Sequence, residues 1–184
     1  MSLGVYLGRM LVNPYLQPPL SFNSGGAGYI LDNNAVRVLH HNSEAYHCRP
    51  HGPANEDTML AICLRDSLNQ ILPYNTTDVF NEQRFHIFPP GFHYLYKRQD
   101  RHNSSRPSVD DDWYGYYDEH IREGLSCCSS QSISFHYISF DLMYEIHNYL
   151  YNCPIETKTE YYHSKGDNFS YFELYDPLYL TIEP

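Results

Sequence analysis

The sequence predicts an α/β fold, and three stretches carry that prediction. NEDTMLAICLRDSLNQI, residues 55–71, has apolar residues at helical spacing. SISFHYISF, residues 132–140, alternates apolar and polar side chains as a strand with one polar face does. SGGAGYIL, residues 24–31, is typical of a tight turn that leads into a short apolar element. At 184 residues, the chain is long enough for one domain with a core of its own.

The N-terminal part contains prolines and one glycine turn. Because Pro14, Pro18 and Pro19 interrupt residues 1–23, we expect an extended segment with at most one short strand. After the glycine turn, residues 29–31 are expected to form a short buried strand or the start of a helix. Asp32 is the expected N-cap of a helix that runs to about His41.

The clearest helix is the one within residues 55–71. Its natural N-cap is Asn55, and Glu56 and Asp57 lie in its first turn. One face of this helix carries the apolar residues, which are Leu60, Cys63, Leu64, Leu68 and Ile71.

The second half of the chain contains fewer regular patterns. Residues 73–112 are expected to be rich in loops, interrupted by the candidate strand RFHIF at 84–88. The strand at 132–140 should place Ile133, Phe135 and Tyr137 on one face. A helix is expected from Asp141 to Asn152, because Pro154 stops it. Residues 154–184 are expected to form a divergent Tyr-rich tail outside the unit at 1–153.

Composition excludes some classes of protein. Hydrophobic residues make up 42% of the chain and charged residues 18%, so it can bury a core. Its formal net charge of −10 would repel a nucleic acid backbone, so no nucleic acid partner is expected. We expect neither a membrane span nor a signal peptide within the chain as given, since it has no long apolar run. Any targeting part would lie elsewhere.

Cysteines and glycosylation sequons favour an oxidising, lumenal compartment. There are five cysteines, and three Asn-x-Ser/Thr sequons begin at Asn75, Asn103 and Asn168. A bridge between Cys48 and Cys63 would close a loop worth about 3 kcal/mol, although the sequence leaves the pairing open. The odd total leaves at least one thiol unpaired or paired outside the chain.

Several side chains could carry chemistry, and each has a structural alternative. Glu56 and Asp57 could complement the helix dipole, or one of them could act as a general base. His136 on a polar strand face could be a hydrogen-bonded surface residue or a metal ligand. The triplet in PSVDDDWYGYYD could place a cation between Asp110 and Asp112, or it could be an acidic loop.

Other motifs are weaker signals. The histidine-rich group has no spacing that matches a closed four-ligand zinc site; its members are His40, His41, His47, Cys48 and His51. The glycine turn lacks the G-x-G-x-x-G spacing of a dinucleotide site and the Lys-Ser/Thr of a P-loop.

The order of the motifs resembles one enzyme family. YLGRMLVNPYL, SGGAGYIL, EDTMLAICL, RFHIFPP, WYGYYDEHIREGLSCCSSQSISFHYIS and MYEIHNYLY follow one another from about Val5 to Tyr151. This order is similar to the catalytic domain of the core 1 β1,3-galactosyltransferases. These inverting, Mn2+-dependent Golgi enzymes transfer galactose from UDP-galactose to the 3-hydroxyl of GalNAc-Ser/Thr on glycoproteins.

The resemblance implies the C-terminal part of a GT-A type glycosyltransferase domain, a mixed sheet with flanking helices, at residues 1–153. In the family, a metal-binding Asp-x-Asp lies upstream of the segment that matches YLGR, so the 184 residues alone are expected to be inactive. The triplet at Asp110–Asp112 follows a polar loop and does not match that motif. We therefore interpret it as a solvated acidic loop.

The resemblance also assigns roles to individual residues. By matching ED, Asp57 would be the catalytic base, with Glu56 as the alternative base or a hydrogen-bonding partner of the sugars. By matching SFHY, His136 would be a ligand of Mn2+. Other matched positions would bind substrate: Gly25, Gly26 and Gly28 beside the donor galactose, Trp113, Tyr116 and Tyr117 as a platform for the GalNAc-peptide, and Glu123 and Gly124 in the following loop.

The resemblance leaves two alternatives and one departure. The family's prolines after the aromatic segment are replaced here by Asp118, Glu119 and His120, which weakens the transfer of acceptor contacts. The family includes a chaperone relative without the Asp-x-Asp, so a non-catalytic chaperone-like or truncated relative is the alternative. The resemblance implies a Golgi lumenal location as part of a type II membrane protein, and a homodimer or a chaperone partner is possible.

Overall fold

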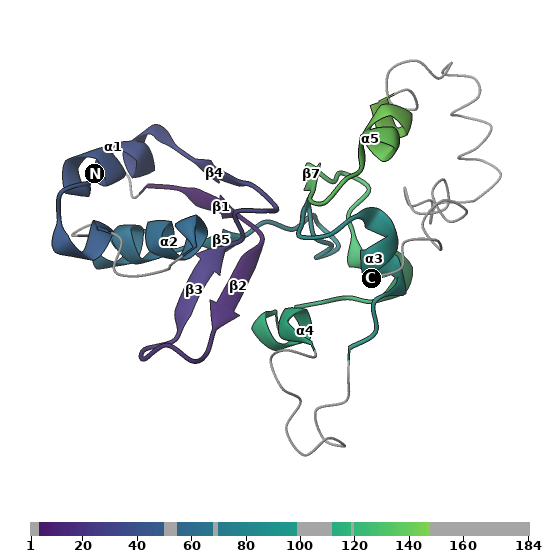
Figure 1. Ribbon diagram of the computed structural model, residues 1–184, viewed down its shortest axis with the longest axis horizontal. Coiled ribbons are helices and arrows are strands. Elements are labelled where there is room, and N and C mark those ends of the chain that lie inside the picture. The colour runs from purple at the N-terminus through teal and green to yellow at the C-terminus, as the bar shows by residue number, and fades with distance from the viewer. Residues whose placement is uncertain (1–3, 50–54, 68–69, 99–111, 119, 148–184) are drawn as a thin grey trace.

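The computed structural model describes residues 4–49, 55–67, 70–98, 112–118 and 120–147. Within them, four short strands come first along the chain, and helices and three further short strands follow (Figure 1). This arrangement confirms the expectation of an α/β chain, and the described strands form small sheets. The expected tail at 154–184, together with Cys153, lies outside the described residues.

The strands form three small sheets. In the three-stranded sheet, β1 (Tyr6–Gly8) lies between β4 (Tyr29–Leu31), which is antiparallel to it, and β5 (Tyr74–Asn75), which is parallel. Strands β2 (Met10–Asn13) and β3 (Leu20–Asn23) form an antiparallel hairpin. Strands β6 (Phe85–His86) and β7 (Ser134–Phe135) pair in parallel although almost fifty residues separate them in sequence.

The expectation of at most one strand before residue 24 is wrong, because β1, β2 and β3 all lie there. Pro14, Pro18 and Pro19 fall in the connection between β2 and β3, where no ladder hydrogen bond needs their missing N–H. For residues 29–31 the sequence left open a short buried strand or the start of a helix, and the structure has strand β4 there. Its central residue, Ile30, is 46% exposed, so the strand is not fully buried.

The two N-terminal helices are confirmed, but the second ends at Asp66, five residues before the end of the predicted segment 55–71. The α1 helix (Asn33–Asn42) begins after Asp32, whose carboxylate accepts a 2.8 Å hydrogen bond from the Ala35 N–H. The α2 helix (Glu56–Asp66) begins after Asn55, although the Asn55 side chain makes no capping hydrogen bond. A disulfide between Cys48 and Cys63 joins the 3₁₀ helix η1 (Tyr46–Cys48) to α2.

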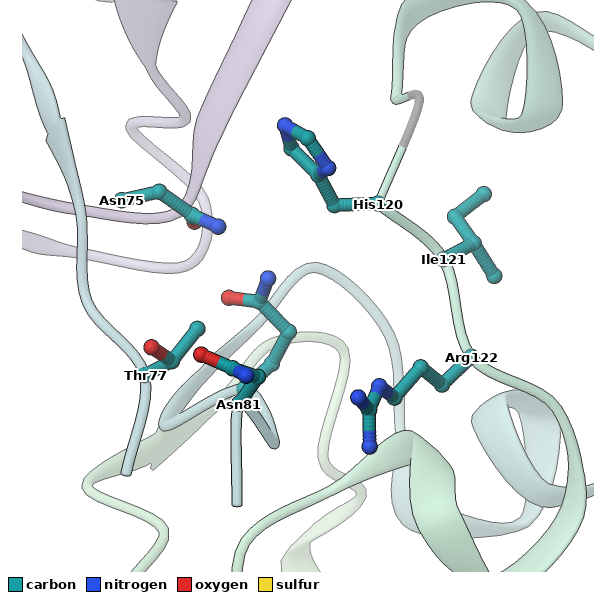
Figure 2. A pocket seen from close by; sticks show the side chains of 7 residues that line it. Asn75, Thr77, Asn81, His120, Ile121 and Arg122 are labelled. Carbon is teal, nitrogen blue, oxygen red and sulfur yellow. The ribbon is translucent and has the colours of Figure 1, made fainter. Parts of the chain in front are cut away.

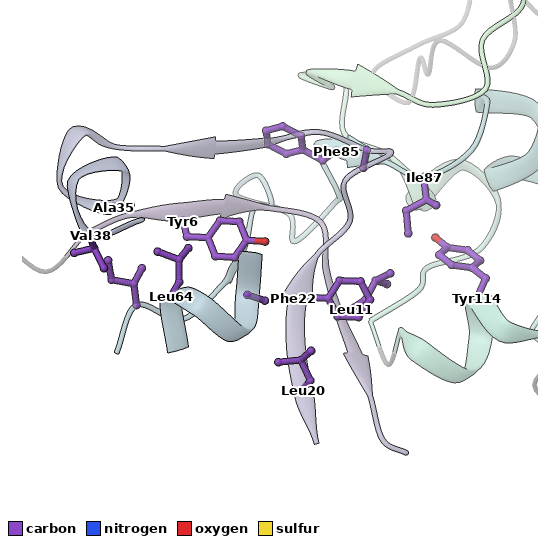
Figure 3. Close-up of a cluster of buried hydrophobic side chains, with 13 residues drawn as sticks. Tyr6, Leu11, Leu20, Phe22, Ala35, Val38, Leu64, Phe85, Ile87 and Tyr114 are labelled. Atoms are coloured by element: carbon purple, nitrogen blue, oxygen red, sulfur yellow. The ribbon is translucent and has the colours of Figure 1, made fainter. Parts of the chain in front are cut away.

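The main hydrophobic core lies between these helices and the strands. Figure 3 shows Tyr6, Ala35, Val38 and Leu64 packed together under the first sheet. The same cluster continues through the β2–β3 hairpin to residues of the second half, which are Phe85, Ile87 and Tyr114. One continuous core therefore connects the two halves of the described chain.

A buried ion pair reinforces this connection. Arg9 follows β1 and precedes β2 in the sequence. Its guanidinium lies 2.5 Å from a carboxylate oxygen of Asp118, and both side chains are almost fully buried. Arg9 also donates a 2.9 Å hydrogen bond to the Tyr114 hydroxyl. These contacts connect the segment between β1 and β2 to the C-terminal end of the α4 helix (Trp113–Tyr117).

The second half is more helical than the sequence predicted. Between residues 73 and 112 the structure adds α3 (Pro90–Leu95), and the aromatic segment that follows, for which no helix was expected, forms the short helix α4. Asp112 caps α4 through a 2.9 Å hydrogen bond from the Gly115 N–H. A 3₁₀ helix η2 (Gly124–Cys127) and the α5 helix (Phe140–His147) complete the described elements.

Strand β7 is much shorter than the predicted strand at 132–140. Tyr137 has a φ of 56°, in the left-handed region that strands do not adopt, so the ladder ends before it. As a result, Ile133 and Tyr137 are largely exposed and do not share a buried face with Phe135. The RFHIF prediction is confirmed only at Phe85–His86. Of the helix predicted at 141–152, residues up to His147 are confirmed, and the rest lies outside the described chain.

No described helix combines the length and the apolar character needed to span a membrane.

Candidate functional site

The glycine turn at residues 24–28 docks onto the start of α2. The Gly25 N–H donates a 2.9 Å hydrogen bond to Oδ2 of Asp57. The turn is closed by a 3.0 Å hydrogen bond from the Gly28 N–H to the Gly25 carbonyl, and Gly28 has a φ of 80°. A left-handed φ favours glycine, so the sequence SGGAG is suited to this turn.

Two glycines of the turn allow close approach by functional side chains. A Cβ on Gly25 would lie 3.2 Å from Oε2 of Glu56 and 3.3 Å from the Cβ of Asp57. A Cβ on Gly26 would lie 2.2 Å from Nδ1 of His136, which is far inside van der Waals contact. The structure therefore brings the acid pair and His136 next to neighbouring glycines of one turn.

His136 is held there by the pairing of β6 with β7. His136 directly follows β7, and its backbone N–H donates a 3.0 Å hydrogen bond to the carbonyl of His86 in β6. The hydroxyl of Ser134 donates to the carbonyl of Ala27, which fastens β7 directly to the glycine turn. The imidazole of His136 stacks on the ring of Tyr137, with the ring centroids 3.8 Å apart.

The two acids have different environments. Asp57 is half-buried, and its second oxygen accepts a 2.8 Å hydrogen bond from the Thr58 N–H. Glu56 is exposed and accepts a hydrogen bond from the Tyr29 hydroxyl. Burial and this bond to Glu56 raise the pKa of Tyr29, so its hydroxyl stays protonated and remains a donor. Asp57 is thus oriented by two backbone donors, and Glu56 by a side chain.

A cavity of about 390 Å³ opens between these elements. Asp57, Gly26 and His136 all line this cavity. Its remaining lining is largely apolar or aromatic: Leu11, Phe22, Ser24, Asn55, Ile87, Trp113, Tyr117 and Tyr137. A carboxylate, an imidazole and aromatic faces around a pocket of this size can bind one sugar ring and hydrogen-bond its hydroxyls.

Some of the predicted substrate residues lie elsewhere. The ring of Tyr116 stacks on Tyr15, with centroids 5.3 Å apart and planes 4° apart. Glu123 binds Nζ of Lys97 at 3.0 Å and accepts a 2.9 Å hydrogen bond from the Arg98 N–H. Neither Glu123 nor Gly124 lines the cavity of Asp57 and His136. Their roles in substrate binding remain predictions.

The structure adds residues that sequence reasoning did not assign to the site. Tyr29, which holds Glu56, begins the strand directly after the glycine turn. Tyr137, next to His136, also lines the cavity, and its ring stacks on the imidazole. Asn55 and Ile87 were assigned only structural roles. These residues reach the site through contacts between segments that are distant in the sequence, so no local sequence pattern predicts their place there.

The acidic triplet is only partly described. Asp110 lies outside the described residues. The interpretation of a solvated loop is wrong for Asp112, which is half-buried and accepts hydrogen bonds of 2.9 and 2.8 Å from the Tyr96 hydroxyl. This carboxylate caps α4 and so has a structural role.

Three other buried groups could hold a metal ion. The potential ligand atoms of His86, His93 and Cys128 all lie within 4.8 Å of one another. However, His93 already uses both nitrogens, since Nε2 accepts a 3.1 Å hydrogen bond from the Phe88 N–H and Nδ1 lies 3.2 Å from the Tyr114 hydroxyl. Among the described residues, the histidine-rich group around His40 and His47 forms no such cluster.

Acid should destabilise the fold through the buried histidines. Burial, with a smaller contribution from Arg9, lowers the pKa of His93 from 6.5 to about 3. Below pH 6.5 the unfolded chain therefore binds a proton that the folded chain does not, and the free energy of unfolding falls. From pH 7 to pH 5, His93 alone should remove about 2 kcal/mol, measured by urea denaturation.

His86 should act in the same direction, since burial also lowers its pKa. The variant His93→Phe should flatten the pH dependence of unfolding, whereas the exposed control His40→Gln should leave it unchanged. Equal pH dependence in His93→Phe and the unchanged chain would show that His93 is not buried as the structure describes.

Substitution of two glycines in the turn should separate site geometry from stability. Gly26→Ala should displace the His136 ring, because the new Cβ would lie 2.2 Å from Nδ1, while the free energy of unfolding should change little. Gly28→Ala should instead lower the free energy of unfolding by about 1–2 kcal/mol, because alanine is strained at the left-handed φ of this residue. The new Cβ itself would meet no atom within 4 Å. NMR signals of the His136 ring and urea denaturation measure the two effects. A His136 ring that shifts equally in both variants would contradict this geometry.

Comparison with known proteins agrees with a transferase-like relationship. No family model matches the chain. A glycoprotein-N-acetylgalactosamine 3-beta-galactosyltransferase 1 from Xenopus laevis is 30% identical to it over 149 residues, which are 80% of this chain and 38% of that protein. The chain thus spans well under half the length of this relative. The relationship is galactosyltransferase-like and does not point to a specific member of that group.

Proposed function

We propose that this chain contributes the acceptor side of the active site of an inverting UDP-galactose-dependent β1,3-galactosyltransferase. The acceptor would be GalNAc-Ser/Thr on a glycoprotein, and the reaction would form a core 1 O-glycan. The observation that carries this proposal is the cavity shared by Asp57, Gly26 and His136. The similarity to the Xenopus laevis galactosyltransferase supports the reaction class.

The cavity is suited to one in-line displacement at a sugar. Asp57 would take the proton of the acceptor hydroxyl, and its carboxylate is already oriented by N–H donors from Gly25 and Thr58. Trp113 and Tyr117 would stack on the C–H face of the acceptor sugar. Gly25 and Gly26 would let the backbone approach the donor galactose. Glu56, held by Tyr29, would hydrogen-bond the sugar hydroxyls.

We further propose that His136 is one ligand of Mn2+. When bound, the cation would neutralise charge on the leaving diphosphate. The donor set fits this only in part, because one imidazole is a single ligand and both oxygens of Asp57 are engaged by backbone N–H groups. Manganese prefers several oxygen ligands, so the remaining ones would come from an Asp-x-Asp outside this chain. The 184 residues alone would then be inactive.

A GT-A type architecture for residues 1–153 and a Golgi lumenal location belong to the same proposal. The disulfide between Cys48 and Cys63 supports an oxidising compartment. UDP-galactose and a GalNAc-bearing glycoprotein would be the substrates, and a homodimer or a chaperone partner is compatible with this proposal.

A chimera tests the proposed function. The chain would replace the matching 149-residue segment of the Xenopus laevis galactosyltransferase. We expect Mn2+-dependent transfer from UDP-galactose to a GalNAc-peptide, and no transfer by the 184 residues alone. A chimera that folds and binds UDP but transfers no galactose would contradict the proposal. That result would favour a non-catalytic, chaperone-like relative.

A further inference from the structure

A second pocket lies apart from the cavity of Asp57 and His136, with no lining residue in common. Figure 2 shows its side chains, which come from the segment around β5 on one side and from residues 120–122 on the other. The pocket has a volume of about 450 Å³ and a mostly polar lining: Asn75, Thr77, Asn81, Gln83, His120, Ile121 and Arg122. Its size is adequate for a sugar ring.

One wall of this pocket is a rigid hairpin. Thr77 and Gln83 face each other in an antiparallel bridge. Between them, Asp78 accepts hydrogen bonds of 2.8 and 3.0 Å from the N–H groups of Phe80 and Glu82, and one of 2.6 Å from the Ser129 hydroxyl. Polar groups on this wall are therefore held in place before any ligand arrives, which lowers the entropic cost of binding.

Gln83 supplies an acceptor that the protein does not satisfy. Its side chain is 1% exposed, and Oε1 has no hydrogen-bond partner among the described residues. The residue cannot easily move, since its carbonyl accepts a 2.8 Å hydrogen bond from the Ser129 N–H. A buried amide oxygen at the wall of a pocket requires a donor from a ligand or from water.

The charge around the pocket favours an uncharged ligand. The positive charge of Arg122 acts to lower the pKa of the Asp78 and Glu82 carboxyl groups. Burial and the nearby Asp78 raise the pKa of Glu82, and Arg122 opposes this shift. One cation beside two carboxylates does not provide the positive field that a phosphate or sulfate needs. Amides, a hydroxyl and an apolar Ile121 face are instead the groups that bind sugar hydroxyls and C–H faces.

Asn75 places a glycosylation sequon at the same pocket. Residues 75–77 read Asn-Thr-Thr, and Oδ1 of Asn75 accepts a 3.2 Å hydrogen bond from the Met10 N–H. In Figure 2 the amide of Asn75 points towards the space in front of His120. An N-linked glycan bonds to Nδ2 and leaves Oδ1 as an acceptor, so this hydrogen bond is compatible with glycosylation.

We propose that this pocket binds an uncharged sugar of the N-acetylglucosamine type. Two sources share this chemistry: the first sugar of a glycan on Asn75 of the same chain, or a sugar of a separate molecule. The proposal does not depend on the galactosyltransferase activity, because no residue of that site takes part.

The first experiment tests the chain's own glycan. The full chain is secreted from insect cells, and glycopeptide mapping determines whether Asn75 is modified. If the glycan lies in the pocket, an amidase should remove it from the native protein roughly tenfold more slowly than from the double variant Asn81→Gly/Arg122→Leu. Both substituted residues are exposed at the pocket, so the fold should persist.

The second experiment tests a separate sugar. Chain made in bacteria, without glycans, is mixed with millimolar N,N′-diacetylchitobiose, and saturation-transfer NMR detects binding. The saturation-transfer signal should be about fivefold weaker for the double variant than for the unchanged chain, as expected for removal of one or two hydrogen bonds. Val79→Ala, a control on the same hairpin that is 90% exposed, should keep the full signal. Asp57→Asn should also keep it, which separates this pocket from the proposed galactosyltransferase site.

Either slower release of the Asn75 glycan or chitobiose binding that depends on Asn81 and Arg122 would support the proposal, and would also identify the source. The proposal is overturned if neither the glycan nor chitobiose responds to the double variant, whatever the occupancy of Asn75.

Discussion

Asp57→Asn is expected to lower kcat for galactosyl transfer by the chimera by about 10²- to 10⁴-fold, the range for loss of a general base. The amide is similar in size to the carboxylate but cannot accept the proton of the acceptor hydroxyl. Its oxygen can still accept a hydrogen bond from the Gly25 N–H, so the turn should stay docked on α2. The KM for the GalNAc-peptide should therefore change much less than kcat.

A matched control is available on the same helix. Asp66 is the last residue of α2, where it pairs with Arg65 at 2.6 Å and does not line the cavity. Asp66→Asn should leave both kcat and KM unchanged. If Asp57→Asn lost no more activity than Asp66→Asn, Asp57 would not be the base, and Glu56 would be the next residue to test.

Arg9→Met is expected to lower the free energy of unfolding by about 3–5 kcal/mol, the cost of leaving a buried charge without its partner. The carboxylate of Asp118 is 1% exposed and lies 2.5 Å from the Arg9 guanidinium. Removal of Arg9 also leaves the buried Tyr114 hydroxyl without its 2.9 Å donor. Urea denaturation followed by circular dichroism measures the loss.

The double variant Arg9→Met/Asp118→Leu distinguishes an unpaired charge from lost packing. Because it removes both charges, it should be considerably more stable than Arg9→Met alone. A double variant as unstable as the single variant would show that Arg9 acts mainly through its packing. The surface pair of Arg49 and Glu44 offers a control, since exposed pairs contribute about 0–1 kcal/mol.

The sequence predicted those elements whose signals are local. Asp32 can cap α1 and Asn55 can start α2 because each cap depends on residues within one turn. Helical spacing of Leu60 and Leu64 likewise depends on neighbours along the same helix. For this reason, both ends of α1 and the start of α2 were predicted to within about one residue, whereas α2 ends at Asp66, five residues before the end of the predicted segment.

Contacts between distant segments were not predicted. The sequence predicted strands at 84–88 and 132–140, but not that β6 and β7 pair across more than forty residues, nor that only two residues of each strand take part. The aromatic segment at Trp113 forms a helix because Asp112 caps it and Tyr114 packs in the core. Tyrosine and tryptophan have no strong helix propensity, so sequence alone favoured a loop there.

Part of the candidate site was accessible from sequence only through resemblance. The motif order suggested that Asp57 and His136 serve one reaction, but no local sequence pattern predicts that residues 26 and 136 are in contact. The structure supplies this contact through the missing Cβ of Gly26. It also adds Tyr29 and Tyr137, whose roles depend on how the glycine turn and β7 meet.

An NMR titration of the labelled 184-residue chain with a GalNAc-peptide tests most directly whether one sugar site lies between the acids and the imidazole. Signals of the Gly25 amide, the Trp113 indole and the His136 ring should all move with a single dissociation constant. Movement of only one of these groups, or of none, would contradict a shared sugar site.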